Sequence, residues 1–202
     1  MSAQQKPVDV VGIGADGWDG LSTAARRRVE AAEVVFGSRR QLDLIPRGAA
    51  ELVAWPSPML PALPGLFAEH DGRAICVLAS GDPMFHGIGA TLARVLGAER
   101  LRVLPHVSSV ALACARLGWA EQDVTVVSLV GRHVELLHPE LQPGRRLIVL
   151  SSDAHTPARV AALLVARDFG SSTMTVLGDL GAPRSPVWAR RRRSGATPRC
   201  PR

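Results

Sequence analysis

The chain has 202 residues, of which 47% are apolar, and a formal net charge of +6. That apolar content can form one large or two small cores, and no apolar run approaches the ~20 residues that cross a bilayer. Seven arginines lie in residues 184–202, and without them 17 basic and 18 acidic residues leave a net charge of −1. The globular part therefore lacks the basic surface typical of nucleic-acid binding.

The first residues, "MSAQQKPVDVV", show no cationic segment followed by an apolar stretch and a small-residue cleavage site. They thus do not resemble a secretory signal, and we expect a cytoplasmic protein. The three cysteines, Cys76, Cys114 and Cys200, are far apart and fit no metal-ligand spacing. We expect Cys76 and Cys114 to be small buried hydrophobic residues.

Along residues 1–120, short β-branched runs alternate with helical patterns. The predicted strands are Val8–Ile13, Val34–Phe36, Glu51–Ala54, Ala74–Ala79 and Leu101–Leu104. The predicted helices are Ser22–Ala32, Ser38–Ile45, Met59–Glu69, Ile88–Leu96 and Ser108–Leu117. This alternation predicts an α/β domain with a largely parallel sheet.

A junction at residues 116–124 places a domain boundary near residue 120, so residues 121–183 form a second α/β domain. Its predicted strands are Val124–Leu129, Leu147–Leu150 and Thr173–Leu177, its helix is Pro157–Asp168, and residues 131–146 are mostly loop. Three strands leave exposed sheet edges, which predicts a homodimer or marginal stability. Residues 184–202, rich in arginine and without a hydrophobic period, are predicted to be disordered.

The first predicted strand runs into G-x-G-x-x-G at Gly12, Gly14 and Gly17. A dinucleotide-binding turn needs a helix that starts at the third glycine, whereas the first good N-cap is Ser22. Arg39 and Arg40 after the next strand could hold a 2′-phosphate, so an NADP-dependent oxidoreductase stays open. A flexible loop without a ligand also stays open, but a loop that meets a ligand through its backbone is favoured.

Two further strands end in similar loops. The strand at residues 74–79 runs into Ser80-Gly81-Asp82-Pro83, and the strand at 101–104 into Pro105 followed by Ser108 and Ser109. Ligands of α/β proteins bind at the carboxyl ends of parallel strands, so three such loops can converge on one site. Asp82 could accept hydrogen bonds from a ligand or cap a turn, and either serine could be a plain helix N-cap.

In these loops the sequence resembles the tetrapyrrole (corrin/porphyrin) methyltransferase family. The matching motifs are "VGIGADG", "SGDPMFHG" and "PHVSS", and "FGSRRQL", "RLGWAEQDVTVVSLVGR" and "LIVLSSDAHTP" resemble the branch that methylates carbon 5 of precorrin-7, the N-terminal half of precorrin-6Y methyltransferases. The similarity covers about residues 7–183. Two positions depart from the family pattern: Ala15-Asp16-Gly17 replaces Pro-Gly-Asp, and His106 replaces a glycine.

The resemblance implies two α/β domains with a ligand cleft between them, S-adenosylmethionine (SAM) as cofactor, and a precorrin or cobalt-precorrin as substrate. It assigns SAM to Ser80, Gly81, Asp82, Phe85, Ser108, Ser109, Leu150, Ser151 and Gly181. It assigns the tetrapyrrole to Gly12, Gly14, Asp16 and Gly17, and its carboxylates to Arg39, Arg40 and Arg132. No residue is expected to act as a protein nucleophile or to bind a metal.

The resemblance ends near residue 183, where relatives continue with further strands. We therefore expect an incomplete second domain and a separate enzyme that methylates carbon 15 and decarboxylates. An inactive remnant of such a methyltransferase is the remaining alternative.

Overall fold

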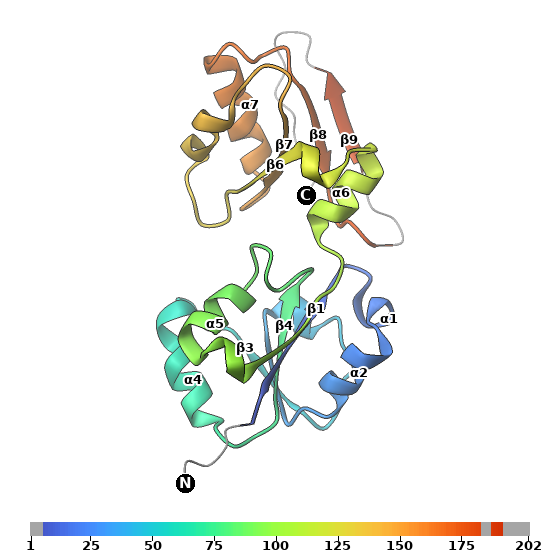
Figure 1. Cartoon of the computed structure of the whole chain (residues 1–202), viewed down its shortest axis with the longest axis vertical. Helices are drawn as coiled ribbons and strands as arrows, with labels where there is room; N and C mark the ends of the chain where they lie inside the picture. The colour runs from blue at the N-terminus through green and yellow to red at the C-terminus, as the bar shows by residue number, and fades with distance from the viewer. Residues whose placement is uncertain (1–5, 183–186, 192–202) are drawn as a thin grey trace. The chain divides into compact units, whose positions relative to one another are not determined.

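The computed structural model describes residues 6–182 and 187–191. Within them the chain divides into two compact units (Figure 1). The first unit comprises the residues up to Ser109 together with Gly181 and Ala182, and the second comprises Val110–Leu180 with residues 187–191. The predicted boundary near residue 120 thus lies beyond this division, which falls at the start of a helix.

The first unit contains a five-stranded parallel sheet, as the strand–helix alternation predicts. Its order is β3-β2-β4-β1-β5. The strands are β1 (Val8–Ile13), β2 (Val34–Gly37), β3 (Glu51–Ala54), β4 (Ile75–Ser80) and β5 (Leu101–Leu104). In the register of the central strands, Val10 of β1 lies opposite Val77 of β4 on one side and Val103 of β5 on the other. The carboxyl ends of β4, β1 and β5 are therefore neighbours along one edge of the sheet.

Helices cover both faces of this sheet (Figure 1). They are α1 (Gly17–Gly20), α2 (Thr23–Glu30), α3 (Arg39–Leu42), α4 (Leu63–Glu69) and α5 (Gly89–Leu96), with 3-10 turns η1 (Leu60–Ala62) and η2 (Ala98–Arg100). Val10 and Val77 pack with α4 and α5, whereas their neighbours Val11 and Leu78 pack with α2 and α3. Alternate residues of each strand thus enter opposite cores, which explains the continuous apolar runs in the sequence.

Two predicted helix starts agree with the structure. The Ser22 hydroxyl accepts a hydrogen bond from Ala25 N at 3.2 Å and begins α2. Ser38 begins α3 with a reciprocal capping box to Gln41. Both helices end earlier than expected. The loop after β1 also differs from the expectation of an uninterrupted loop, because Gly17, at φ +61°, starts the single helical turn α1.

The second unit is built on smaller sheets. Its elements are α6 (Ser109–Leu117), which begins at the boundary, η3 (Glu121–Asp123), β6 (Val124–Ser128), η4 (Val134–Glu140), β7 (Arg146–Leu150), α7 (Thr156–Ala166), β8 (Thr173–Leu177) and β9 (Val187–Arg191). β6 pairs with β7 in parallel, and β8 pairs with β9 antiparallel, as two separate two-stranded sheets. The expectation that the three predicted strands share one sheet is therefore wrong.

Helix α6 belongs to the core of the second unit. Val110, Ala113 and Cys114 on its buried face form a cluster with Ile148 of β7. This packing places the division before α6. The segment between β6 and β7, predicted to be mostly loop, contains the 3-10 helix η4, in which Leu137 is fully buried.

Val187–Arg191 falls within the segment predicted to be disordered. In the structure these five residues form β9, in register with β8 from Thr173↔Arg191 to Leu177↔Val187. The prediction is wrong for this stretch, because the edge of β8 offers unpaired backbone groups that a following segment can satisfy. Residues 184–186 and 192–202 lie outside the described residues.

Candidate functional site at the carboxyl ends of β1, β4 and β5

Backbone hydrogen bonds tie together the three loops that follow β1, β4 and β5. Gly81 N donates to Ile13 O at 3.0 Å, and His106 N donates to Gly81 O at 3.3 Å. The loop of β4 thus lies between the loops of β1 and β5. The structure in this way brings together three of the segments that the sequence assigns to a ligand.

Close backbone approach explains two glycines of these loops. A Cβ atom on Gly12 would collide with Gly81 O and lie 2.6 Å from His106 N. Gly81 has φ +58°, and a Cβ there would lie 3.2 Å from the Ser108 Cα. These glycines let three loops pack against one another. Gly12 of the G-x-G-x-x-G sequence therefore serves loop packing. Helix α1 is a single turn rather than the long helix of a dinucleotide-binding turn.

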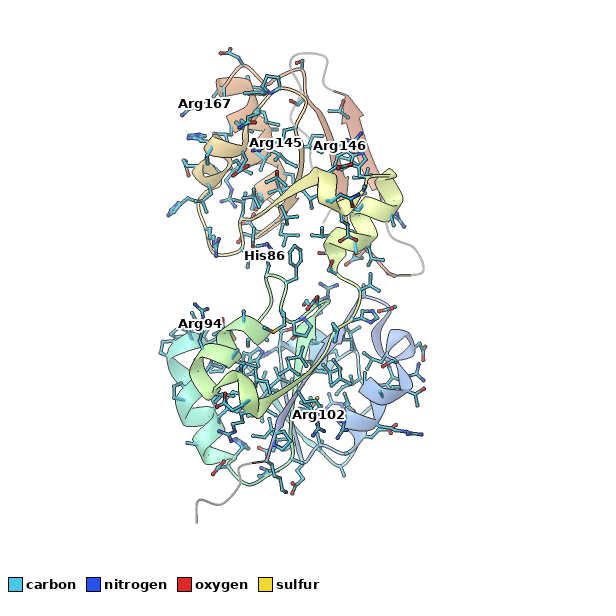
Figure 2. The ribbon with its side chains drawn as sticks, viewed as in Figure 1. His86, Arg94, Arg102, Arg145, Arg146 and Arg167 are labelled. Carbon is cyan, nitrogen blue, oxygen red and sulfur yellow. The ribbon has the colours of Figure 1, made fainter. Side chains whose placement is uncertain are left out.

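The Asp82 loop is a compact turn with an apolar outer surface. The Asp82 Oδ1 atom accepts a hydrogen bond from Met84 N at 2.8 Å. Beyond this turn, Met84 is 49% exposed and Phe85 42% exposed, although both are large apolar side chains. Phe85 contacts His86 edge to face with 4.8 Å between ring centroids, and Figure 2 labels His86 at this loop. The turn-capping role of Asp82 is thus present, and it leaves the Oδ2 atom for another partner.

Gln41 connects helix α3 to the carboxyl end of β4, and we did not identify it from the sequence. Its Nε2 atom donates to the Ser80 hydroxyl at 3.0 Å, while its Oε1 atom accepts from Ser38 N at 2.8 Å. The capping box in "SRRQ" was the available signal. Arg39 and Arg40 lie exposed on the same short helix α3. The arginines assigned to substrate carboxylates therefore share a helix with a residue that contacts the end of β4.

A carboxylate–imidazole pair joins the loops of β1 and β5. The His106 Nε2 atom lies 3.1 Å from Asp16 Oδ1 and 3.2 Å from Oδ2. The side chains are 14% and 32% exposed, respectively. A Cβ on Gly14 would lie 2.8 Å from the same Nε2 atom. From the sequence we assigned Asp16 to the substrate and noted that His106 departs from the family pattern. The pair itself was not predictable, because no local pattern connects residues 90 positions apart.

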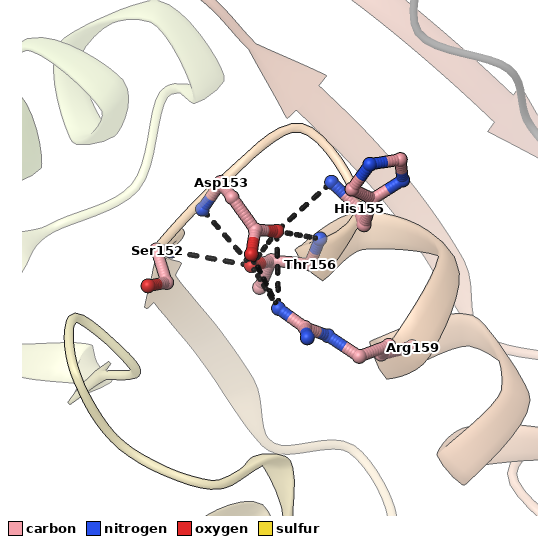
Figure 3. Close-up of polar contacts among 5 residues, drawn as sticks. All are labelled: Ser152, Asp153, His155, Thr156 and Arg159. Atoms are coloured by element: carbon pink, nitrogen blue, oxygen red, sulfur yellow. Dashed lines mark hydrogen bonds and ion pairs between the residues drawn. The ribbon is translucent and has the colours of Figure 1, made fainter.

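Two predicted SAM residues, Leu150 and Ser151, lie in the second unit at the end of β7. Leu150 ends that strand, half-buried, and Ser151 is exposed. The next residues form the polar network of Figure 3, in which Asp153 Oδ1 accepts from Thr156 N at 2.8 Å and from the Thr156 hydroxyl at 3.0 Å. Arg159 Nη2 donates to the same carboxylate at 2.9 Å.

These contacts give Asp153 a structural role. The hydrogen bond from the Thr156 hydroxyl, with further backbone and arginine contacts, lowers the pKa of Asp153. The carboxylate thereby caps the start of α7, an interaction that sequence analysis missed although "SSDAHTP" carries an acid three residues before the helix start.

Two other predicted residues, Arg132 and Gly181, complete the set. Arg132 is exposed in the segment between β6 and β7, and Gly181 is exposed with φ +94°. The predicted site residues therefore form two main groups, one at the sheet edge of the first unit and one at the end of β7.

Three further features concern the cysteines, metal binding and membrane spans. Cys76 and Cys114 are buried, as expected, and burial raises the pKa of the Cys76 thiol. Within residues 6–182 and 187–191, no three His, Cys, Asp or Glu side chains gather in a group that could hold a metal ion. No helix in the same residues has the length and apolar character to span a membrane.

Two sequence relatives cover most of the chain. It is 49% identical over 187 residues to a precorrin-6Y C(5,15)-methyltransferase [decarboxylating] of Mycobacterium tuberculosis, a match that covers 92% of this chain but 45% of the relative. It is 33% identical over 168 residues to a cobalt-precorrin-7 C(5)-methyltransferase of Salmonella typhimurium, covering 83% of this chain and 82% of the relative. The chain thus spans about half the length of the mycobacterial relative.

Solved structures and a family model agree with these relatives. The precorrin-6Y methylase of Archaeoglobus fulgidus superposes with a TM-score of 0.66 and 26% identity, covering 91% of this chain and 88% of that one. The uroporphyrin-III C-methyltransferase of Thermus thermophilus, solved with S-adenosylhomocysteine, superposes with a TM-score of 0.65 at 23% identity, covering 92% and 83%. Neither an NADP-dependent oxidoreductase nor an inactive remnant finds support in these similarities. Because the model of the Tetrapyrrole (Corrin/Porphyrin) Methylases matches residues 8–192, the chain belongs to this family.

Proposed function

We propose that this protein uses SAM to methylate carbon 5 of a precorrin, either precorrin-7 or its cobalt form. The relatives named as precorrin-6Y and cobalt-precorrin-7 methyltransferases support the reaction. The single structural observation that carries the proposal is the succession of hydrogen-bonded loops at the carboxyl ends of β4, β1 and β5. This edge is where α/β sheets bind ligands.

The residues of the first unit fit SAM. The backbone of Gly81, in the left-handed conformation, has no side chain to obstruct a ligand, and the exposed rings and chains of Met84, Phe85 and Val107 lie on the two adjoining loops. Such a mixture of apolar side chains and a few polar groups is typical of small-molecule sites. Asp82 adds a carboxylate for an ammonium or a hydroxyl group, and Ser108 and Ser109 add hydroxyl groups.

SAM supplies an electrophilic methyl group on a sulfonium when it is bound. The thioether that leaves needs no proton, so the chain need not supply an acid for it. The chain's task is then to position the methyl group against an electron-rich carbon of the macrocycle and to exclude water. Positioning alone can contribute ~7–11 kcal/mol to such a reaction. The rigid contact between Gly12 and Gly81 suits this task, and the exposed Arg39 and Arg40 provide cations for the carboxylates of the macrocycle.

The test of SAM binding is a calorimetric titration of the whole chain with SAM, repeated with Asp82→Ala and Asp82→Asn. Loss of a hydrogen bond to a charged group costs roughly 1.5–3 kcal/mol, so Asp82→Ala should bind about ten- to a hundredfold more weakly. Asp82→Asn keeps an acceptor for Met84 N but removes the negative charge, so it distinguishes the effect of the charge from the effect of the turn. The exposed Asp123, in the second unit, gives the control Asp123→Ala, which should bind as the wild type does. Wild-type affinity in both Asp82 variants would remove Asp82 from the site.

The names of the relatives also bear on which carbon of the macrocycle is methylated. The mycobacterial relative, of which this chain covers 45%, is named for carbons 5 and 15 and for decarboxylation, whereas the Salmonella relative, of which it covers 82%, is named for carbon 5 alone. Both names include carbon 5, and this shared part supports methylation at that carbon. We place the protein in the cytoplasm as a homodimer, and sedimentation velocity tests the dimer.

A further inference from the structure

The pair His106–Asp16 joins the two positions at which the first unit departs from the family pattern. The acidic residue stands at Asp16 rather than one position later, and a histidine stands at 106 in place of glycine. In the structure these two side chains meet at 3.1 Å. All polar contacts of the imidazole within residues 6–182 and 187–191 go to Asp16. The pair lies among the loops that we assign to SAM and the macrocycle.

The contact defines which ring nitrogen can accept a proton. An ionised carboxylate only accepts hydrogen bonds, so the His106 Nε2 atom facing Asp16 must carry the hydrogen in the neutral ring. The Nδ1 atom then keeps a free lone pair. The ring is also held in place, because its own backbone N donates to Gly81 O and the backbone of Gly14 lies against its Nε2 edge. A fixed imidazole with one defined acceptor is the arrangement of a general base.

We propose that His106 accepts the proton released when the macrocycle is methylated and that Asp16 positions it. This rests on the proposed function. The ring carbon forms a bond to the methyl group while the bond from that methyl to sulfur breaks, and its electron pair stays on the sulfur. The C–H bond of the methylated carbon then breaks. Its electron pair returns to the conjugated ring, and the proton goes to Nδ1 of His106. The resulting imidazolium is stabilised by the Asp16 carboxylate and later loses its proton to water.

The charged groups around the pair are compatible with this role. Asp16 faces the ring from the loop of β1. On the loop of β4, Asp82 directs Oδ1 to Met84 N, and on β5 the nearest cation in sequence, Arg102, pairs with Asp9 at 3.4 Å. Arg102 lies opposite Asp9 near the start of β1, away from the carboxyl edge. The positive charge that His106 gains is therefore balanced by Asp16.

The decisive experiment compares wild type, His106→Gln and Asp16→Asn in single-turnover methylation at saturating SAM and cobalt-precorrin-7. General acid–base groups contribute typically 10²–10⁴-fold, and we expect the lower end, a loss of about 10²-fold, in His106→Gln. In His106→Gln, SAM and substrate affinities should stay within about twofold. The pH profile of the rate should also differ between the wild type and His106→Gln, because the variant lacks the proton acceptor. The exposed His133 of the second unit gives the control His133→Gln, which should match the wild type.

Nitrogen-15 NMR of the imidazole gives a readout that needs no turnover. In the neutral imidazole of the wild type, we expect the hydrogen on Nε2 and none on Nδ1. In Asp16→Asn an amide N–H can donate to Nε2, so the proton should move to Nδ1 and the methylation rate should fall with it.

The outcomes separate this proposal from the proposed function. A wild type that binds no SAM and transfers no methyl group overturns both. A wild type that methylates, together with a His106→Gln variant of equal rate and unchanged pH profile, overturns only the role of His106. A neutral wild-type imidazole that carries its hydrogen on Nδ1 overturns that role even if His106→Gln fails to fold.

Discussion

The two units differ in the sheets from which their loops extend. In the first unit the loops follow strands of a five-stranded sheet covered on both faces, whereas in the second unit they follow strands of two-stranded sheets. β1 and β4 are buried over almost their whole length, while most residues of β6 and β8 are only half-buried. The loops of the first unit consequently meet backbone to backbone, through Gly12 and Gly81. In the second unit the loop after β7 is ordered instead by side chains, through Asp153 and Thr156. In this protein the larger, covered sheet thus carries loops packed through glycines, and the smaller sheet carries a loop held by polar side chains.

The largest expected effect comes from the core of the first unit. Phe36 is fully buried, stacks on Trp55 at 5.3 Å and contacts Phe67 at 5.4 Å between ring centroids. Phe36→Ala should lower the free energy of unfolding by about 3–5 kcal/mol, measured by urea denaturation. In hydrogen exchange, the amides of β2 and β4 should lose more protection than the amides of β6 and β7. Equal loss in all four strands would mean that the units unfold as one. The exposed Leu136 provides a control, because Leu136→Ala should change stability by no more than about 0.5 kcal/mol.

The stability of the second unit should depend on β9, which pairs with β8. A chain that ends at Ala182 lacks β9, so the five paired residues of β8 lose their partner. Each hydrogen bond lost costs about 1 kcal/mol net. Loss of at least two of them should therefore lower the free energy of unfolding of the second unit by roughly 2 kcal/mol or more. A chain that ends at Arg191 keeps β9 and is the matched control for urea denaturation. Equal stability of the two shortened chains would show that β9 contributes nothing.

The glycine contacts of the first unit can be tested with alanine. A Cβ at Gly12 would collide with Gly81 O, so Gly12→Ala should destabilise by about 1–3 kcal/mol and weaken SAM binding as the loops move apart. Gly65 lies in α4 with no heavy atom within 4 Å of a built Cβ. Gly65→Ala should therefore raise stability, by about 0.5–1 kcal/mol. Thermal melting and SAM titration measure both effects, and a Gly12→Ala variant as stable as wild type would contradict the close packing.

The smallest expected effects are opposite pH dependences in the two units. Burial raises the pKa of Asp9 in β1, against the influence of Arg102, whereas hydrogen bonding from Thr156 lowers the pKa of Asp153. Asp9 therefore stabilises the fold below the ordinary carboxyl pKa of 3.8, and this contribution is lost as pH rises through its folded value. Asp153 stabilises above 3.8, and its contribution is lost as pH falls through its lowered value.

Substitution should remove each dependence. Relative to wild type, Asp9→Asn should gain stability as pH rises from about 3 to 7, and Asp153→Asn should lose it. Urea unfolding across that range measures both slopes. Slopes of the same sign in the two variants would contradict the contrast between the buried strand carboxyl and the helix-capping one.

Local patterns determined much of this protein. The bounds of β1, β3, β5 and β8 agree with those predicted from short apolar runs, because each run alone satisfies the period of a strand. The starts of α2 and α3 were predictable since a serine N-cap bonds only three residues away. The three glycine- and serine-bearing loops were also predictable, because parallel strands bring their carboxyl ends to one edge.

Only the tertiary structure decided what those loops do to one another. The sheet order, the pairing of β8 with β9, the Gln41–Ser80 contact and the His106–Asp16 pair each join segments that no local period connects. Val187–Arg191 has the composition of a disordered tail, yet it is a strand because the open edge of β8 supplies its hydrogen bonds. Local sequence determines which backbone conformation a segment prefers, but a partner distant in the chain determines whether its polar groups are satisfied.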